Sequence, residues 1–501
     1  MTGLIESRLN TYSPSQNNIN SYKTFSIRDF GVVGDGIADD TQALQSAIDF
    51  LGKQKFPDGD PRTLKNEISK IQYFTVLDLD SGHYLISKPL KLNNIYGCII
   101  SNGTITASKD FPLDEYLLDF LGINTTKLEN LLLECRKRAN GIYAHKFFRL
   151  RVEDCTILHQ KSYGIYGSET GYNHELEIFK CNISEYLWGD GQKNAKVDSE
   201  ASKFPDFRVA SNRQSTGIFL GQADNIVADC NINLCKVGIK VGMRANRIQG
   251  NHITAGGTYK ESIFEGIVLD KHVKSSCLIV NNYIDNCRLL IRVDAKPVNK
   301  RNYVTVTDNL FYRGFNHPEG KEFNHIVIRP LAKNSVLQNI IVSNNQFYTQ
   351  DEHLKNQPQR VIKPVHINCD PVNKGKTKSI IPSIDNSLVS GTVMRENNFT
   401  NAAPYYEIPM GTNLTGIIQF PSEETDTYCI DFSKHIPWGK IHTYKVTMTV
   451  AEGGNPVPFA VTDVSNNQIT IKTKKPLIAR FDVEVDVNSS YSDFDSNIVV
   501  H

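Results

Sequence analysis

An eight-residue pattern of apolar and polar positions recurs along the middle of the chain. Apolar residues alternate with polar ones, a Cys or Asn follows, and another apolar residue comes two positions later; the clear copies are 150–157, 176–183, 225–232, 246–253, 277–284 and 304–311. Weaker copies end near Asn345 and Asn397. Alternation with a period of two indicates a strand with one buried face. Strand units repeated every 20 to 50 residues or so are typical of a parallel β-solenoid.

The spacing of the Cys or Asn, which we expect at a buried corner, supports coiling around one axis. Successive corners lie 26, 49, 21, 31, 27, 36 and 52 residues apart, so each short spacing fits one coil and each long one a coil with an insertion. Another strand follows in each coil, at 164–168, 217–221, 238–242, 266–270, 290–294 and 325–329. We therefore predict an all-β fold, a right-handed single-stranded parallel β-helix over residues 23–400 in which stacked Asn side chains hydrogen-bond along the corner. The alternative is a β-sandwich with accidental internal similarity.

The two ends of the chain depart from this pattern. Residues 1–22 are polar and turn-rich and are expected to be a linker or stub. Apolar residues recur at helical spacing near 40–53, which predicts a helix that starts at Asp39 or Asp40 and caps the open end of the solenoid. Residues 401–438 are expected to be a linker, and 439–501 show the alternation of a small antiparallel β domain.

Composition excludes several classes of function. The 55 Lys and Arg against 54 Asp and Glu leave a net charge of +1, so nothing directs the whole molecule to nucleic acid or an anionic membrane. No run of 18 apolar residues predicts a membrane span, and the polar first residues predict no secretory signal. Three of the ten Cys residues, Cys155, Cys181 and Cys230, occupy corner positions, which favours free, buried thiols over a disulfide framework.

The phrase FSIRDFGVVGDGIADDTQALQSAID, followed by LDLDSGHYLISKPLKL, closely resembles the opening of the pectate-lyase-like, right-handed parallel β-helix superfamily. Within it the chain is most similar to bacteriophage tailspike proteins that depolymerise host capsule or O-antigen. The resemblance covers residues 23–400 and is specific for the fold rather than the reaction; Asp80-Ser81-Gly82 stands where such proteins commonly have Pro-x-Gly. It implies a homotrimer located in the virion tail, and a C-terminal module for trimerisation or sugar binding.

The chemistry has to be carried by ordinary polar side chains on the solenoid wall. The sequence contains no G-x-S-x-G, H-E-x-x-H, paired C-x-x-C, Walker or EF-hand motif, so we expect neither a metal site nor a cofactor. Aligning the Ile residues of the 164–168 type of strand makes Ile267 and Ile291 neighbours. That alignment places outward columns at Tyr166, Phe219, Lys240, Val268, Arg292 and Val327, and at Ser168, Gly221, Gly242, Asp270, Asp294 and Arg329.

This alignment makes Asp270 and Asp294 the predicted catalytic pair. Rungs stack about 4.8 Å apart, so the two carboxyls should be neighbours, with Arg292 and Arg329 beside them. Glu265 precedes the strand as a further candidate and His272 follows it as a possible substrate contact. Paired carboxylates with split pKa values suit glycosidic hydrolysis, with about 5 Å between them for retention and about 6.5–9.5 Å for inversion. The competing interpretation is a solvated charge ladder, and the loop acids Asp190, Asp198, Glu200 and Asp206 are rival candidates.

Aromatic residues add a possible binding platform. Tyr166 and Phe219 should face outward, with Tyr186 and Trp188 on the nearby insertion 186–215, and an exposed aromatic row can stack on sugar rings. The insertion could equally cover them; further insertions fall at 254–264 and 348–388. The favoured function is hydrolysis of a bacterial surface polysaccharide. The alternatives are β-elimination by a polysaccharide lyase, glycan adhesion without cleavage, and a cellular hydrolase or transferase of the same superfamily.

Overall fold

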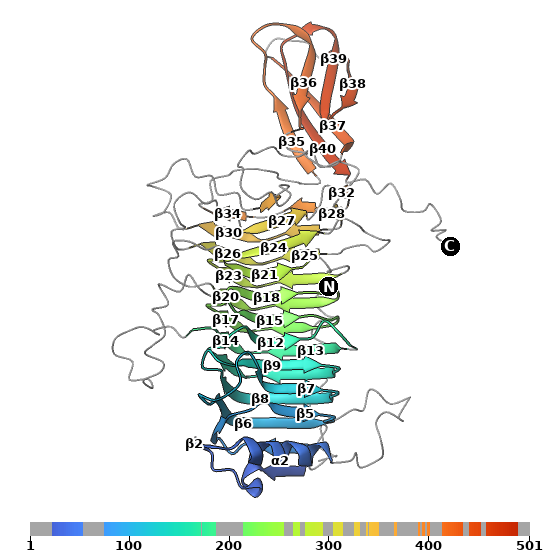
Figure 1. Ribbon diagram of the computed structural model, residues 1–501. Helices are drawn as coiled ribbons and strands as arrows, with labels where there is room; N and C mark the ends of the chain where they lie inside the picture. The colour runs from blue at the N-terminus through green and yellow to red at the C-terminus, as the bar shows by residue number, and fades with distance from the viewer. Residues whose placement is uncertain are drawn as a thin grey trace, which may run out of the picture.

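The computed structural model describes residues 23–53, 75–171, 173–186, 214–254, 264–270, 276–293, 304–313, 325–330, 337–338, 340–349, 365–367, 389–390, 393–395, 398–400, 413–433, 440–451 and 457–488. Most of the chain forms a column of stacked coils that begins at helix α2, and a small β module lies beyond the last coil (Figure 1). Among the described residues, no helix is long and apolar enough to cross a membrane.

Each regular coil contributes three short strands, one to each of three walls. The coil that starts at residue 148, for example, runs through β10 (Phe148–Glu153), β11 (Thr156–Leu158) and β12 (Tyr163–Gly167). These strands pair in parallel with β13 (His174–Phe179), β14 (Asn182–Ser184) and β15 (Thr216–Leu220) of the next coil. The predicted parallel β-helix is therefore confirmed.

The first and second walls form one sheet of 22 strands, because two long strands, β6 (Cys98–Ala107) and β8 (Asn124–Glu134), run through both. The other first-wall strands are β1 (Lys23–Ser26), β3 (Thr75–Asp78), β16 (Ile226–Ala228), β19 (Asn246–Gln249), β22 (Cys277–Val280), β25 (Val304–Thr307), β29 (Ile340–Ser343) and β33 (Val393–Arg395). The other second-wall strands are β2 (Asp35–Asp39), β4 (His83–Ile86), β17 (Asn231–Asn233), β20 (His252–Thr254), β23 (Tyr283–Asp285), β26 (Leu310–Arg313), β30 (Gln346–Thr349) and β34 (Asn398–Thr400).

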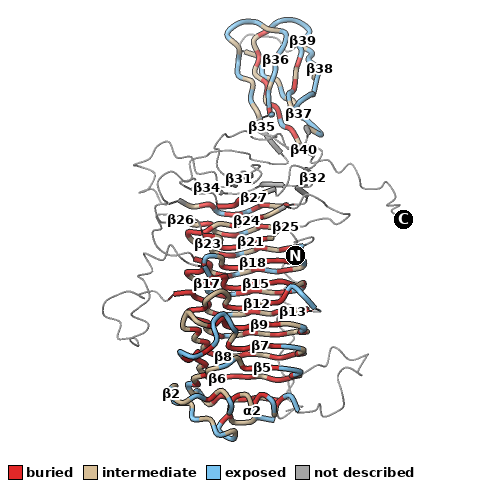
Figure 2. The backbone as a smooth tube through the Cα atoms, in the orientation of Figure 1, coloured by how far each residue is buried: buried red, intermediate tan, exposed pale blue. Residues whose placement is uncertain are grey.

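The third wall is a separate sheet of ten strands. Besides β12 and β15 it contains β5 (Leu90–Asn93), β7 (Tyr116–Leu121), β9 (Asn140–His145), β18 (Val237–Val241), β21 (Glu265–Leu269), β24 (Arg288–Val293), β27 (Ile326–Pro330) and β31 (Val365–Ile367). Two further short strands, β28 (Leu337–Gln338) and β32 (Val389–Ser390), pair with each other. Inward residues from all three walls make one continuous apolar core along the axis, visible as buried stretches in Figure 2.

The corner between the first and second walls is built as the repeated pattern predicts. The residue before each corner adopts the left-handed conformation, with φ of 56° at Asp229, 64° at Gly250 and 55° at Asn281. The corner side chain then turns inward and bonds to the next coil: Asn282 Oδ1 accepts from the backbone N–H of Asn251 at 3.0 Å and from its Nδ2 at 2.9 Å. The same two bonds join Asn282 to Asn309 and Asn309 to Asn345. The ladder thus satisfies buried backbone donors that no strand pairing reaches.

Cysteines continue this corner column toward the N-terminus. Cys155, Cys181 and Cys230 are buried and free, as predicted, and their thiols donate to backbone carbonyls of their own turns. The column also continues between coils, because the backbone N–H of Cys181 donates to Cys230 Sγ at 3.4 Å and the backbone N–H of Cys230 donates to Asn251 Oδ1 at 2.9 Å. A thiol therefore takes the place of the Asn amide at these corners, as a weaker hydrogen-bonding group.

Glycine is required where the chain enters the third wall. Gly141, Gly164, Gly217 and Gly238 lie on successive coils, and a Cβ on each would meet the carbonyl oxygen of the next glycine at 2.3–2.7 Å. Each such Cβ would also lie within 2.8 Å of an inward-facing Ile methyl group. The coils can therefore stack this closely only because these glycines have no side chain.

Helix α2 (Thr41–Gly52) covers the first coil, preceded by the 3-10 helix η1 (Ile27–Phe30). Leu44, Ile48 and Leu51 face the core, which confirms the predicted cap. Asp40 occupies the N-cap position, but its carboxylate accepts instead from the backbone N–H groups of Val33 and Gly34. Asp39 accepts from the N–H of Thr41 at 3.0 Å. The pair of aspartates therefore fixes both the helix start and the preceding loop.

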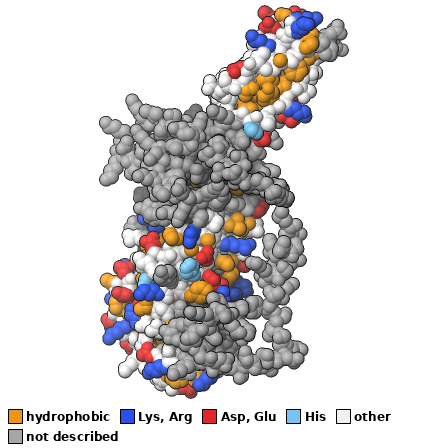
Figure 3. Space-filling model, turned by 90° about the vertical axis from the view of Figure 1, so that its right-hand side faces the viewer, with side chains coloured by type: hydrophobic (Ala, Val, Ile, Leu, Met, Phe, Trp, Pro, Cys, Tyr) orange, Lys and Arg blue, Asp and Glu red, His pale blue; other side chains and the backbone are white. Residues whose placement is uncertain are grey.

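The C-terminal module is antiparallel and begins earlier than the sequence suggests. One sheet contains β35 (Asn413–Ile418), β40 (Ala479–Asn488) and β37 (Lys440–Val450); the other contains β36 (Thr425–Asp431), β39 (Gln468–Leu477) and β38 (Phe459–Ser465). Strands β35 and β36 fall within 401–438, the stretch expected to be a linker, and pair with β40 and β39. The module has its own small core around Tyr428, Ile471 and Phe481. Tyr444 and Phe459 are among its exposed apolar residues, and one face of the module shows a group of apolar side chains (Figure 3).

We predict that Gly238→Ala destabilises the solenoid by about 1–3 kcal/mol, because overpacking a tight contact costs that much. Its Cβ would lie 2.5 Å from the Gly266 carbonyl oxygen and 2.7 Å from Ile253 Cγ2. Thermal unfolding followed by circular dichroism measures the effect. Gly52→Ala is the matched control, since a Cβ there meets nothing closer than 3.4 Å and alanine favours helix. Equal melting midpoints for the two variants would contradict the packing argument.

Candidate functional site

The third wall brings five of the predicted site residues close together, with one change of register: Lys240, Glu265, Asp270, Arg292 and Arg329. Ile267 pairs with Leu289, and Leu269 with Ile291, so β24 is shifted by two residues from the predicted alignment. The expected pairing of Ile267 with Ile291 is therefore wrong. The residue in register with Asp270 is Arg292, the next after Ile291, and Arg292 pairs in turn with Arg329. Asp294 comes two positions later and lies outside the described residues.

Asp270 lies at the end of β21 between two cations. Lys240 Nζ, one coil before, is 3.1 Å from Asp270 Oδ2, and Arg292 Nη1, one coil after, is 3.4 Å from Asp270 Oδ1. The Asp270 side chain is 18% exposed, so it is partly shielded but reachable. Each carboxylate oxygen therefore has its own positive partner from a neighbouring coil. A charge-assisted contact of this kind orients a carboxylate and favours its ionised form.

Glu265, at the start of the same strand, is held differently. Arg288 reaches it with two nitrogens, Nε to Oε2 at 2.8 Å and Nη2 to Oε1 at 2.5 Å. A two-pronged Arg–carboxylate pair has a fixed geometry, and both side chains are largely buried. The ion pair therefore holds the Glu265 and Arg288 side chains in a fixed relative position.

Arg329 extends the positive side of the site. Burial and the nearby Arg288 and Arg292 lower its pKa from the usual range, partly offset by Glu265. The lowered pKa of Arg329 reports its burial first and the neighbouring like charges second, and the guanidinium stays protonated at any ordinary pH. Among the residues that the structure describes here, there are four cations, Lys240, Arg288, Arg292 and Arg329, and two carboxylates, Asp270 and Glu265, an excess of two positive charges.

The predicted aromatic row exists, but it is more closed than expected. Rings stack along the third wall from Tyr116 through Tyr143 and Tyr166 to Phe219, with centroids 4.9–5.7 Å apart. Lys240 Nζ lies 5.2 Å from the Phe219 ring centre. Phe219 is only 3% exposed, so it is not available for sugar stacking as predicted. Tyr166 is half-buried, and burial raises its pKa to about 12.

The remaining predicted contacts, His272 and Trp188, lie outside the described residues, as do the loop acids. Tyr186 is described and is buried against Leu234, with Lys137 Nζ 3.7 Å from its ring centre. The outward column beyond Lys240 is apolar: Val268, Leu290 and Val327 form a buried cluster on the outer side of the third wall. Polar chemistry on this wall is therefore concentrated around Asp270.

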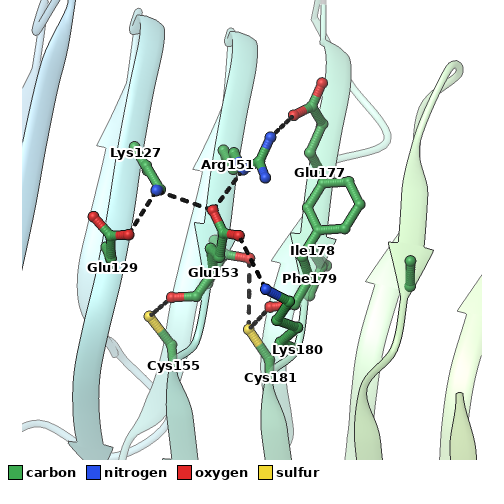
Figure 4. A network of polar contacts seen from close by, with 12 residues as sticks. Lys127, Glu129, Arg151, Glu153, Cys155, Glu177, Ile178, Phe179, Lys180 and Cys181 are labelled. Atoms are coloured by element: carbon green, nitrogen blue, oxygen red, sulfur yellow. Dashed lines mark hydrogen bonds and ion pairs between the residues drawn. The ribbon is translucent and has the colours of Figure 1, made fainter. Parts of the chain in front are cut away.

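A second charged cluster, which sequence reasoning missed, lies on the outer side of the first wall (Figure 4). Lys127 Nζ bridges Glu129 at 2.8 Å and Glu153 at 2.9 Å. Arg151 contacts Glu153 at 2.9 Å and Glu177, on the next coil, at 3.6 Å. Outward polar positions in consecutive copies of the repeated pattern carried this signal, because period-two alternation places them in one column.

The two carboxylates of this cluster have pKa values that move apart. Burial opposes ionisation of Glu153, but hydrogen bonds from Arg151 and Lys127 outweigh it and lower the pKa. Burial raises the pKa of Glu177, which Arg151 only partly offsets. Hydrogen bonds from Lys127 and Arg151 thus keep Glu153 ionised, whereas the charges of Arg151 and Arg149 only partly offset the burial of Glu177. The cluster is therefore a ladder of ion pairs that links three successive coils and stabilises their stacking.

Opposite effects of two substitutions would test this ladder. Glu153→Gln should lower the free energy of unfolding by about 1–3 kcal/mol, because Lys127 and Arg151 lose a buried partner. Glu177→Gln should leave the melting midpoint at pH 7 unchanged or raise it, because its folded-state pKa is raised and the charged form is therefore disfavoured.

Melting curves at pH 7 and near pH 4 test the sign of the contribution that each carboxylate makes to the free energy of unfolding. The contribution of Glu153 is present above the unfolded pKa, which is roughly 4.3, and is lost as pH falls through its lowered folded value. The penalty from Glu177 disappears as pH falls below its raised folded value. Destabilisation of similar size by both substitutions at pH 7 would refute the assignment.

The comparisons with known proteins agree with this fold. The family described as rhamnogalacturonase A/epimerase, pectate lyase-like, matches residues 24–292, more than half of the chain. The chain therefore belongs to this family, which is pectate-lyase-like with a glycan-degrading fold. The polygalacturonase QRT3 of Arabidopsis thaliana is 28% identical over 229 residues, and the match spans 42% of this chain and 42% of that protein.

Similar solved structures include a tailspike protein, a surface adhesin and a hydrolase. The Dettilon tailspike protein (gp208) has 12% identity and a TM-score of 0.41, covering 97% of this chain and 100% of that chain. PfbA, a surface adhesin of Streptococcus pneumoniae, has 14% identity and a TM-score of 0.42, with coverages of 77% and 93%. The endo-xylogalacturonan hydrolase from Aspergillus tubingensis has 10% identity and a TM-score of 0.37, with coverages of 75% and 100%. Similarities this low carry no argument about function.

Proposed function

We propose that this chain is a polysaccharide depolymerase of the tailspike type, which hydrolyses glycosidic bonds of a bacterial capsule or O-antigen. The observation that carries the proposal is Asp270, a reachable carboxylate held between Lys240 and Arg292 on the outer side of a wall in the family-matched region. The sequence resemblance of the opening motif to tailspikes supports the source of the polymer. By the same resemblance, the working assembly is a homotrimer on the virion tail.

In this proposal Asp270 is the nucleophile or general base. A carboxylate with a cation at each oxygen is suited to accept a proton or attack carbon, not to donate a proton. Asp294 remains the proposed proton donor. With the register found here, Arg292 takes the position beside Asp270 that the sequence alignment gave to Asp294. The cations then have two uses, orienting Asp270 and attracting the polymer.

The local excess of positive charge favours an acidic polymer. Lys240 on β18 lies on one side of Asp270, and Arg292 on β24 and Arg329 on β27 lie on the two coils that follow, so these cations can contact carboxylate or phosphate groups along a bound chain. The same cations keep β-elimination as a second candidate, because Arg and Lys can stabilise the enolate that forms when the proton beside a uronate carboxylate is removed. Adhesion without cleavage is the third candidate.

Asp270→Asn should reduce the rate of polymer cleavage by about 10²–10⁴-fold, because it removes an acid–base or nucleophilic group. Asp294→Asn should have an effect of similar size. The assay measures new reducing ends released from purified capsular and O-antigen polysaccharides by the full-length chain. Mass spectrometry of the products separates the mechanisms, since hydrolysis adds water across the bond and elimination leaves an unsaturated sugar.

Asp308→Asn is the control, because Asp308 lies on the exposed turn between the first and second walls, where its left-handed φ of 57° also suits Asn. It should cleave at the wild-type rate. Undiminished cleavage by both Asp270→Asn and Asp294→Asn would remove the assignment of these residues. Binding of a polymer without any product from the wild-type chain would replace the depolymerase with an adhesin.

A further inference from the structure

The second wall carries two pairs of stacked aromatic rings on its outer side. His252 on β20 stacks on Tyr283 on β23, with ring centres 4.7 Å apart and planes 5° apart. Tyr312 on β26 stacks on Tyr348 on β30 at 5.3 Å and 5°. The four strands are consecutive along this wall (Figure 1). Aromatic side chains therefore line four coils in succession on a wall distinct from that of Asp270.

The two pairs are offset from one another, which breaks the stack. Tyr283 is in register with Leu310, whereas Tyr312 is in register with Asp285. The Tyr283 and Tyr312 rings meet edge to face, at 6.0 Å and 73°. A continuous stack would hide every ring face against its neighbour. The change of orientation between Tyr283 and Tyr312 interrupts the row, and we call this place the step.

A carboxylate stands at that step. Asp285 Oδ2 accepts from Thr254 Oγ1 at 3.2 Å and lies 4.0 Å from His252 Nε2, and Asp285 Oδ1 accepts from Asn286 Nδ2 at 2.5 Å. The Asp285 side chain is 19% exposed. Burial and the Asp285 charge raise the pKa of Tyr283 to about 12, so its phenol keeps its proton. The step therefore offers fixed acceptors and a phenolic donor beside aromatic carbon.

The step lies around a tight corner from the start of the third wall. In this coil, β23 ends at Asp285 and β24 begins at Arg288, so two residues, Asn286 and Cys287, make the connection. The backbone N–H of Asn286 also donates to the Tyr312 carbonyl oxygen at 2.9 Å. On the third wall Arg288 binds Glu265 on the neighbouring coil. One sharp turn thus separates the step from the Arg288–Glu265 pair, and Asp270 follows the far end of β21.

We propose that His252, Thr254, Tyr283, Asp285, Tyr312 and Tyr348 form a second glycan subsite, which binds a neutral pyranose of a chain that also reaches the third wall. An aromatic ring packs on the apolar face of a sugar, and a carboxylate accepts from two adjacent hydroxyl groups. An acidic sugar would be repelled by Asp285, whereas the third wall attracts one. The inference goes beyond the proposed function, because it concerns binding and holds whether or not the polymer is cut.

Spacing also suits a glycan. Rungs of the wall rise by about 4.8 Å, close to the length of one pyranose ring, so a glycan that runs along the wall can place one sugar at the step and its neighbours beside the two stacked pairs. The subsite should then matter for long fragments that reach both walls and not for short ones bound at the third wall alone. Simple packing of the second wall by these rings would give no such dependence on length.

The test compares binding of long and short fragments. An Asp270→Asn chain, which should not cut the polymer, is titrated with purified capsular and O-antigen polysaccharides and with fragments of a few sugars made by acid hydrolysis. Adding Tyr312→Ala or Asp285→Asn should weaken binding of the long polymer about five- to tenfold, the effect of losing one good aromatic or charged contact. Affinity for the short fragments and the melting midpoint should stay unchanged. Adding Asp308→Asn provides the matched control.

Unchanged affinity of both variants for the long polymer would overturn the subsite. So would an equal loss for long and short fragments together with a lower melting midpoint, because that pattern reports a packing role. A chain that binds no polymer of the panel would overturn it as well. Polymer binding that depends on Tyr312 and Asp285, with no cleavage by the wild-type chain, would support the subsite and refute the proposed hydrolysis.

Discussion

The structure depends on the register of one coil on the next. At the first corner, Asn251, Asn282, Asn309 and Asn345 each bond both the backbone and the side chain of a neighbour. At the entry to the third wall, glycines allow the carbonyl groups of adjacent coils to approach. These two features fix how far coils are separated and which residues face each other. Residues more than twenty positions apart, such as Lys240, Asp270 and Arg292, therefore become contacts.

The sequence predicted the coils well because the corner pattern is local. Each copy combines alternation with a Cys or Asn at a fixed position, and the strands at every clear copy are those found in the structure. The capping helix followed in the same way from apolar residues at helical spacing. Strands β35 and β36 were not predicted and fall within the expected linker. Short strands with many exposed polar residues show only a weak alternation of apolar and polar positions.

The register of β24 could not be read from the sequence for a physical reason. A shift of two residues keeps every inward residue inward, so Ile291 fits the core equally well beside Ile267 or Leu269. The irregular pairing between Glu265 and Ile267 accounts for one residue of the shift. Its consequence is chemical: the residue in register with Asp270 is a cation, Arg292. Among the residues that the structure describes, the site is thus a carboxylate among cations, while the sequence suggested a pair of adjacent carboxylates.

Cross-linking of engineered cysteines tests this register most directly. In a Cys429→Ser background, which removes an exposed thiol, Asp270→Cys is combined with either Arg292→Cys or Asp294→Cys. Disulfides need Cα atoms about 4.4–6.8 Å apart, and residues in register on adjacent parallel strands lie about 4.8 Å apart. Peptide mass spectrometry under mild oxidation should show faster cross-linking of the 270–292 pair. Faster cross-linking of the 270–294 pair would contradict the register and restore the adjacent carboxylates.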